Sequence, residues 1–134
     1  MPRVSHLFFQ SGIVFLVIGI GMGLQMSISG VHNVTGAHAH LNLLGWVTSA
    51  LFGGYYALNP AKAATRLAMV HYGVYTLGVA VMVLGLYFLL QGNASFEPLV
   101  AGGSLVTFAG VLIFGYTGFA PARTASPARP MPAE

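Results

Sequence analysis

Two histidines separated by one residue are the side chains in this sequence with the clearest potential for chemistry. His38 and His40 begin an apolar stretch, 36–58, that is long enough to cross a bilayer as a helix. Ionisable side chains are costly in such a segment and are rare there unless they bind a ligand or line a polar path. On an α-helix, residues two positions apart point in directions about 200° apart, so the two imidazoles leave opposite faces. We therefore expect them to serve two different sites.

The composition around this pair indicates an all-α integral membrane protein. The chain has 134 residues, of which 56% are hydrophobic and 5% are charged. It has room for about four transmembrane helices of ~20 residues each, and we expect them in one domain, residues 1–119. The expected helices are 7–28, 36–58, 64–90 and 95–118. A tail at 120–134, rich in proline and alanine, cannot bury a core and is expected to be disordered.

Local signals mark one packing surface and two helix ends. Gly19 and Gly23 form a pair of small residues that would let a second helix approach closely, although glycine is also simply tolerated in membrane helices. Asn59-Pro60 ends the second helix, because proline has no amide hydrogen to donate. Ser95 is expected to be the N-cap of the fourth helix.

The basic residues predict the orientation in the membrane. In the four-helix scheme they all fall on one side: Arg3, Lys62, Arg66, Arg123 and Arg129. The positive-inside rule then places both termini in the cytoplasm, and we expect a bacterial inner-membrane protein. His38 and His40 would lie near the outer face, and His71 more than ~10 Å deeper at ~1.5 Å of rise per residue. Five scattered basic residues form no nucleic-acid-binding patch.

Haem is the cofactor that best suits the histidine pair. The chain has no cysteine, which excludes thiolate metal sites and covalent attachment of a c-type haem. Neutral imidazole is an axial ligand of haem iron, and the macrocycle is apolar enough to lie between membrane helices. An alternative stays open, in which His38 and His40 only hydrogen-bond to carbonyls or to interfacial water. His71 is a weaker metal-ligand candidate, for which a structural role is favoured because nothing nearby completes a site.

The order of these motifs resembles the catalytic subunit of haem-copper oxidases and nitric oxide reductases, particularly the C-type oxidases. In that family the tenth of twelve helices carries a His-x-His followed by a Gly-Trp pair, and the eleventh begins with a histidine-aromatic pair. The matching residues here are His38-Ala39-His40, Gly45-Trp46, Tyr55-Tyr56, Pro60 and His71-Tyr72. The resemblance covers residues 30–90.

Carried over to this chain, the resemblance implies haem b. It implies that His38 matches the axial ligand of the high-spin haem and that His40 matches a ligand of the low-spin haem. Asn42, Gly45 and Trp46, in the same stretch, are the candidate contacts to the cofactor. The family's copper ligands and active-site tyrosine are not found, so haem binding is implied rather than copper-dependent oxygen reduction.

Two functions follow from these residues. The first is a b-type haem membrane protein that transfers electrons to or from a redox partner or binds a gas such as O2 or NO; neither role requires the chain to be an enzyme. The alternative is a copper-handling or oxidase-assembly protein. It rests on Met22 and Met26, one helical turn apart, which with His32 or His38 could form a soft Cu(I) site.

The size of the chain predicts how it assembles. The related subunit arranges twelve helices as three four-helix arcs, and this chain is the size of one arc with its histidine helix second of four. Three copies around a threefold axis would rebuild the ring. We expect a homotrimer in which a haem between neighbours takes His40 from one chain and His38 from the next.

Overall fold

The computed structural model describes residues 1–121, and within that range every regular element is a helix. In chain order the elements are α1 (Arg3–Ser29), α2 (Thr35–His40), η1 (Leu41–Thr48), α3 (Ser49–Leu58), α4 (Pro60–Ala63), α5 (Arg66–Leu89), η2 (Ala94–Phe96) and α6 (Glu97–Phe119). Three segments, α1, α5 and Ala94–Phe119, are long and apolar enough to cross a membrane. From residue 122 on, the tail predicted to be disordered lies outside the described residues.

The histidine-bearing stretch is not one uniform helix. From Thr35 to Leu58 the elements α2, η1 and α3 follow one another without a break, and the middle one is a π-helix. Within it the Thr48 hydroxyl donates to the carbonyl of Leu43 at 2.9 Å, and the Leu44 carbonyl accepts from the Tyr75 hydroxyl of α5 at 2.9 Å. Wide π turns of this kind often occur at functional sites, and this one begins directly after His40.

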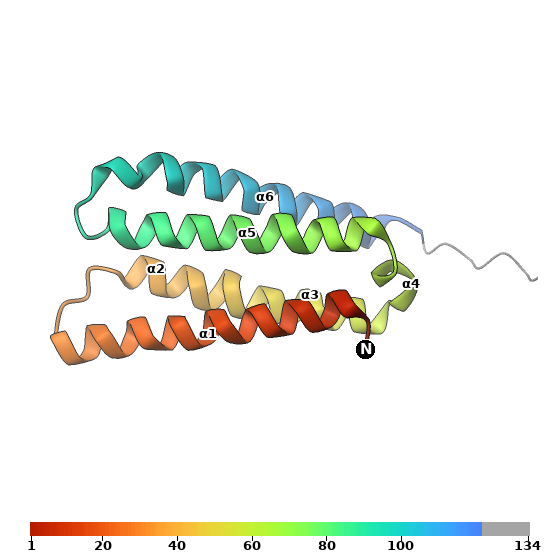
Figure 1. Ribbon diagram of the computed structural model, residues 1–134, viewed down its shortest axis with the longest axis horizontal. Coiled ribbons are helices and arrows are strands. Elements are labelled where there is room, and N and C mark those ends of the chain that lie inside the picture. The colour runs from red at the N-terminus through yellow and green to blue at the C-terminus, as the bar shows by residue number, and fades with distance from the viewer. Residues whose placement is uncertain (122–134) are drawn as a thin grey trace, which may run out of the picture.

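The helices form two antiparallel pairs that lie side by side. Figure 1 shows α1 running along α2 and α3, with α5 running along α6 in the second layer. The central helix is α5, because it packs against α1, α2 and η1 as well as against α6. The short helix α4 joins the two layers at the end where the N-terminus lies, which we call the α4 end.

The core of the bundle is aromatic near the α4 end. Six rings from α1, α3, α5 and α6 contact one another there: Phe8, Phe52, Tyr56, His71, Tyr75 and Phe114. All but Phe114 are buried. This cluster joins the two layers, because it contains residues from both helix pairs.

The first and the fourth predicted helices begin at other residues than predicted. Ser95 does not cap a helix; it lies inside the 3-10 turn η2, and α6 starts at Glu97 without a side-chain cap. The turn itself leads the chain into α6, so the capping prediction was wrong. The first helix begins at Arg3, earlier than predicted, because Ser5 is already packed in the core and its hydroxyl donates to the Gly53 carbonyl at 2.6 Å.

The helices α5 and α6 approach each other closely at Gly103, whereas the neighbouring Gly102 has open space around it. Substitutions at these two positions test the packing. A Cβ at Gly103 would overlap the backbone of Met82, whereas a Cβ at Gly102 would meet nothing within 4 Å. Gly103→Ala should therefore lower the free energy of unfolding by about 1–3 kcal/mol. Gly102→Ala should cause no loss, since alanine favours helix over glycine by about 0.5–1 kcal/mol. Reversible unfolding in mixed detergent micelles measures both; equal stability of the two variants would contradict the packing.

Candidate functional site

His38 turns from α2 toward α1. Its Nδ1 lies 2.7 Å from the carbonyl oxygen of Gly19. A carbonyl can only accept, so Nδ1 carries the hydrogen, and in the neutral ring the lone pair is on Nε2. The ring lies against Gly23, where a Cβ would come within 3.0 Å of His38 Cε1. The two glycines that the sequence marked as a packing pair are therefore the surface that holds this imidazole.

Asn42 supports His38 from one turn along the helix. Its amide nitrogen donates to the His38 carbonyl at 2.9 Å and lies 3.3 Å from His38 Nδ1. Since Nδ1 already donates to Gly19, the 3.3 Å contact is not a second hydrogen bond to the ring. A Cβ at Gly19 would come within 2.7 Å of the Asn42 amide, so glycine is needed at that position. Asn42 is thus packed against α1 beside His38.

His40 lies on the opposite, exposed face. Its Nδ1 donates to the Gly36 carbonyl, one turn earlier, at 2.7 Å. The ring, with Ala39, Leu43 and Leu44, lines a shallow apolar groove of about 200 Å³. All four lining residues come from the same helical stretch, so the groove is open on its other side.

The two imidazoles share one hydrogen-bonding arrangement. In each, a backbone carbonyl accepts from Nδ1, and within residues 1–121 no hydrogen bond is made by Nε2. Metal-ligating histidines show this pattern, because a hydrogen bond to the second ring nitrogen fixes the tautomer and makes Nε2 a better ligand. The rings face different ways, toward α1 and toward the open groove, in accord with the opposite directions expected from the spacing.

Gly45 and Trp46 are packed against α1 on the His38 side. A Cβ at Gly45 would come within 2.8 Å of Phe15, and the Trp46 ring lies 3.1 Å from the position of a Cβ at Gly12. Neither residue lines the groove beside His40. In the single chain their contacts position η1 against α1.

His71 is separate from this pair. Its ring contacts Phe8, whereas His38 contacts Gly19, eleven residues further along α1, a distance of about 16 Å along the axis. The side chain is completely buried, Nδ1 lies 3.1 Å from the Tyr56 hydroxyl, and Nε2 is buried without a hydrogen-bond partner in residues 1–121. Within the described residues no group of three or more His, Cys, Asp or Glu side chains could hold a metal ion.

The methionines of the copper alternative have other contacts. The sulfur of Met26 is buried and accepts a hydrogen bond from the Thr35 hydroxyl at 3.6 Å. Met22 lines an apolar groove between α1 and α5, together with Leu41 and Val83. The exposed ring of His32 is bonded to the Gly30 carbonyl at 3.2 Å. No observation in this part of the chain favours a Cu(I) site.

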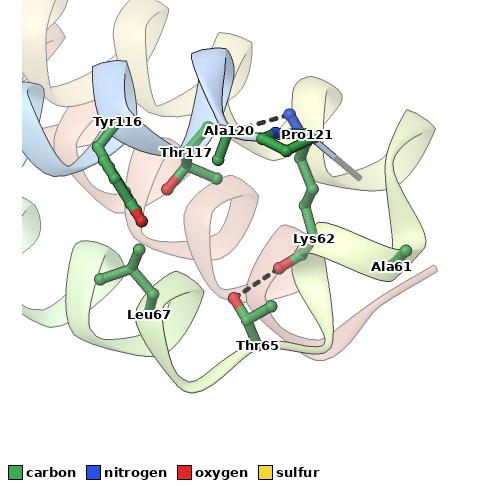
Figure 2. Close-up of a pocket in the computed structure, with 8 residues that line it drawn as sticks. All are labelled: Ala61, Lys62, Thr65, Leu67, Tyr116, Thr117, Ala120 and Pro121. Carbon is green, nitrogen blue, oxygen red and sulfur yellow. Dashed lines mark hydrogen bonds between the residues drawn. The ribbon is translucent and has the colours of Figure 1, made fainter. Parts of the chain in front are cut away.

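A polar cluster at the α4 end was not apparent from the sequence. Lys62 Nζ donates to the Tyr55 hydroxyl at 2.9 Å and to the carbonyls of Thr117 and Gly118 at 2.8 and 3.1 Å. These carbonyls belong to the last turn of α6, where a cation is favourable. Figure 2 shows Lys62 beside a pocket of about 410 Å³ that Thr65 and Thr117 also line. In the sequence, Lys62 served only to predict which end of the helices faces the cytoplasm.

The charges separate along the bundle. Arg3, Lys62 and Arg66 lie at the α4 end, where α1 and α5 begin (Figure 1). Glu97, the only acidic side chain in residues 1–121, lies at the opposite end, in the first turn of α6. The histidine pair is nearer to the end that carries Glu97.

No protein-family model, no curated protein and no solved structure matches this chain. The contacts of His38 and His40, and the motif in which they occur, are therefore the features that indicate a function.

The different burial of the histidines predicts their chemical reactivity. Diethyl pyrocarbonate should modify His40, whose ring is exposed, at least about tenfold faster than His71, which can react only when the bundle opens locally. Peptide mass spectrometry of the detergent-solubilised protein measures both rates. Protein unfolded in sodium dodecyl sulfate is the control, in which the rates should converge. Equal rates in the folded protein would contradict the buried position of His71.

Proposed function

We propose that this chain is a b-type haem-binding membrane protein that transfers electrons or binds a gas, related to the catalytic subunit of haem-copper oxidases. The observation that carries the proposal is the shared arrangement of His38 and His40. Each ring is fixed through Nδ1 by a backbone carbonyl and has Nε2 free to ligate iron. Bound haem would supply one-electron redox chemistry or an iron site for O2 or NO.

The protein's own residues orient the ligands and exclude water. The Gly19 and Gly36 carbonyls hold the two imidazoles in the Nε2 lone-pair tautomer. Asn42 anchors the backbone at His38 through its bond to that carbonyl. Leu43 and Leu44 give the groove beside His40 an apolar surface that an apolar macrocycle would cover. Gly45 and Trp46 act on the ligands indirectly, by fixing η1 against α1.

The membrane arrangement that we propose has four spanning helices. The fourth is the unbroken run from Thr35 to Leu58, in which the π-helix interrupts the α-helical pattern but not the chain's helical course. The basic α4 end faces the cytoplasm by the positive-inside rule, so that both termini are cytoplasmic. His38 and His40 then lie near the outer face.

We further propose that haem lies between protomers of a homotrimer. The groove at His40 has walls from only one helical stretch of the single chain, so a second chain can supply the other side. The two rings face different ways, toward α1 and toward the groove, which suits a haem that would take His40 from one protomer and His38 from the next. Cyclic symmetry closes such a head-to-tail contact.

Haem content tests the proposed function. The purified protein should contain non-covalently bound haem b with a six-coordinate low-spin spectrum, and His40→Ala should remove that spectrum or convert it to high spin. His71→Phe is the control, because a phenyl ring fills the aromatic core and leaves the pair intact. Oxidised and reduced absorption spectra and the pyridine haemochrome measure these effects. A colourless preparation that also fails to take up haemin would refute haem binding.

Native mass spectrometry in detergent tests the assembly. We expect a trimer with equivalent haems, which loses its haem on dissociation because each iron would draw its ligands from two chains. A monomer that keeps its full haem complement and its bis-histidine spectrum would rule out the shared site while leaving haem binding itself intact.

A further inference from the structure

The π-helix that follows the histidine pair has hydroxyl donors on two adjacent carbonyls. The Thr48 hydroxyl donates to the Leu43 carbonyl at 2.9 Å, and the Tyr75 hydroxyl of α5 donates to the Leu44 carbonyl at 2.9 Å. Wide π turns are rare, and they occur where neighbouring groups favour them over the α-helix. A side-chain donor favours them, because a carbonyl that accepts it tilts away from the helix axis. The two hydroxyls therefore stabilise the wide turns of η1.

The wide turns keep one face of the histidine-bearing stretch on α1. This face contacts α1 at both ends: a Cβ at Gly23 would come within 3.0 Å of the His38 ring, and a Cβ at Gly53 within 3.0 Å of the Phe9 ring. An ideal α-helix turns about 100° per residue, so from His38 to Gly53 it would end roughly 60° past a whole number of turns. Turns that hold more residues reduce this difference. The contact of His38 with α1 therefore depends on η1.

Tyr75 is fixed at the place where it can stabilise these turns. Its side chain has no exposed surface, and its ring packs edge-on against Phe52 of α3, with ring centroids 4.9 Å apart. The Phe52 ring is in turn 5.5 Å from that of Phe8 on α1. The aromatic cluster thus fixes α1, α3 and the donor hydroxyl relative to one another. If η1 tightened into an α-helix, α3 would stay in the cluster and the stretch before η1 would rotate.

Such a rotation would change the two imidazoles differently. His38 bonds to the Gly19 carbonyl, which belongs to another helix, so rotation would break this bond. His40 bonds to the Gly36 carbonyl of its own helix, so this bond would persist while the ring changed direction. The bond between His38 and Gly19 therefore measures whether η1 keeps its wide turns.

We propose that Tyr75, assisted by Thr48, is a positioning residue for the histidine pair. Its bond to the Leu44 carbonyl keeps η1 in wide turns and thereby sets the directions of both imidazoles. Tyr75 acts through the backbone of η1 and not through either ring. The inference rests on the proposed function in treating the two imidazoles as haem ligands, because only then does their direction serve binding.

Nuclear magnetic resonance of the whole chain in lipid bilayers tests this role. Isotopic nitrogen in histidine and isotopic carbon at the glycine carbonyls should give dipolar couplings from His38 Nδ1 to Gly19 and from His40 Nδ1 to Gly36. Replacing each histidine by alanine assigns its signal. Reduction with dithionite keeps any low-spin haem iron diamagnetic, so the measurement works with and without haem. Tyr75→Phe should lose most of the His38 coupling and keep that of His40.

Tyr72→Phe is the matched control. Tyr72 lies on the same helix, and its ring packs edge-on against Phe8 with centroids 5.1 Å apart, but the bond to the Leu44 carbonyl belongs to Tyr75. The substitution removes a hydroxyl from α5 without touching η1. Both couplings should equal those of the wild type.

An undiminished His38 coupling in Tyr75→Phe overturns the proposal. Equal loss in Tyr72→Phe, or a parallel loss of the His40 coupling, also overturns it, because either result would indicate general loosening of the bundle. If Tyr75→Phe does not fold, Thr48→Val removes the other hydroxyl donor of η1 and decides between the same outcomes.

Failure of the positioning role is distinguishable from failure of haem binding. A colourless protein that shows the expected loss of the His38 coupling would support the role of Tyr75 and refute haem binding. A haem protein with an intact coupling in Tyr75→Phe would keep the proposed function and refute the role of Tyr75. In haem-loaded protein, Tyr75→Phe should also shift the low-spin electron paramagnetic resonance g values, which depend on the orientation of the axial imidazoles, whereas Tyr72→Phe should not.

Discussion

The hydrogen bond from His38 to the carbonyl of Gly19 is the contact on which the arrangement of the histidine pair depends. In apolar surroundings an imidazole N–H needs an acceptor, and unpaired polar groups cost several times what a formed hydrogen bond contributes. The acceptor here belongs to another helix, so α1 and α2 must lie close together. Gly19 and Gly23 permit that distance, because a side chain at either position would meet Asn42 or the His38 ring. The bond thus couples ligand orientation to helix packing.

The rest of the histidine-bearing stretch also packs closely against α1. Gly45 and Trp46 continue the contact with α1, and the π turns between them and His40 bring the Leu44 carbonyl to the Tyr75 hydroxyl of α5. The π-helix therefore contacts α1 and α5 at the same time. His40, by contrast, needs no second helix for its hydrogen bond, since the Gly36 carbonyl lies one turn away on its own helix. That local bond leaves its ring free to face outward.

The same need for polar partners organises the α4 end. Lys62 donates hydrogen bonds to carbonyls at the end of α6 and to the Tyr55 hydroxyl of α3. These bonds link the two helix layers beside the aromatic cluster. His71 is held by Tyr56 inside that cluster, and its second ring nitrogen has no hydrogen-bond partner in the part of the chain that the structure describes. The bundle therefore has two polar regions with different characters, a pair of imidazoles with an exposed His40 near one end and a buried histidine near the other.

The sequence by itself determined the features that depend on local periodicity and hydropathy. Apolar runs predicted helices long enough to span a membrane, and helical geometry predicted that His38 and His40 leave opposite faces. Only the tertiary structure decided what each side chain meets. The Gly19 acceptor for His38, the Tyr56 partner of His71 and the Lys62 bonds to α6 join residues far apart in the chain, which no local pattern encodes. The π-helix and the 3-10 turn that replaced the Ser95 cap arise in the same way, because packing against neighbouring helices selects them over the regular α-helix that local propensity favours.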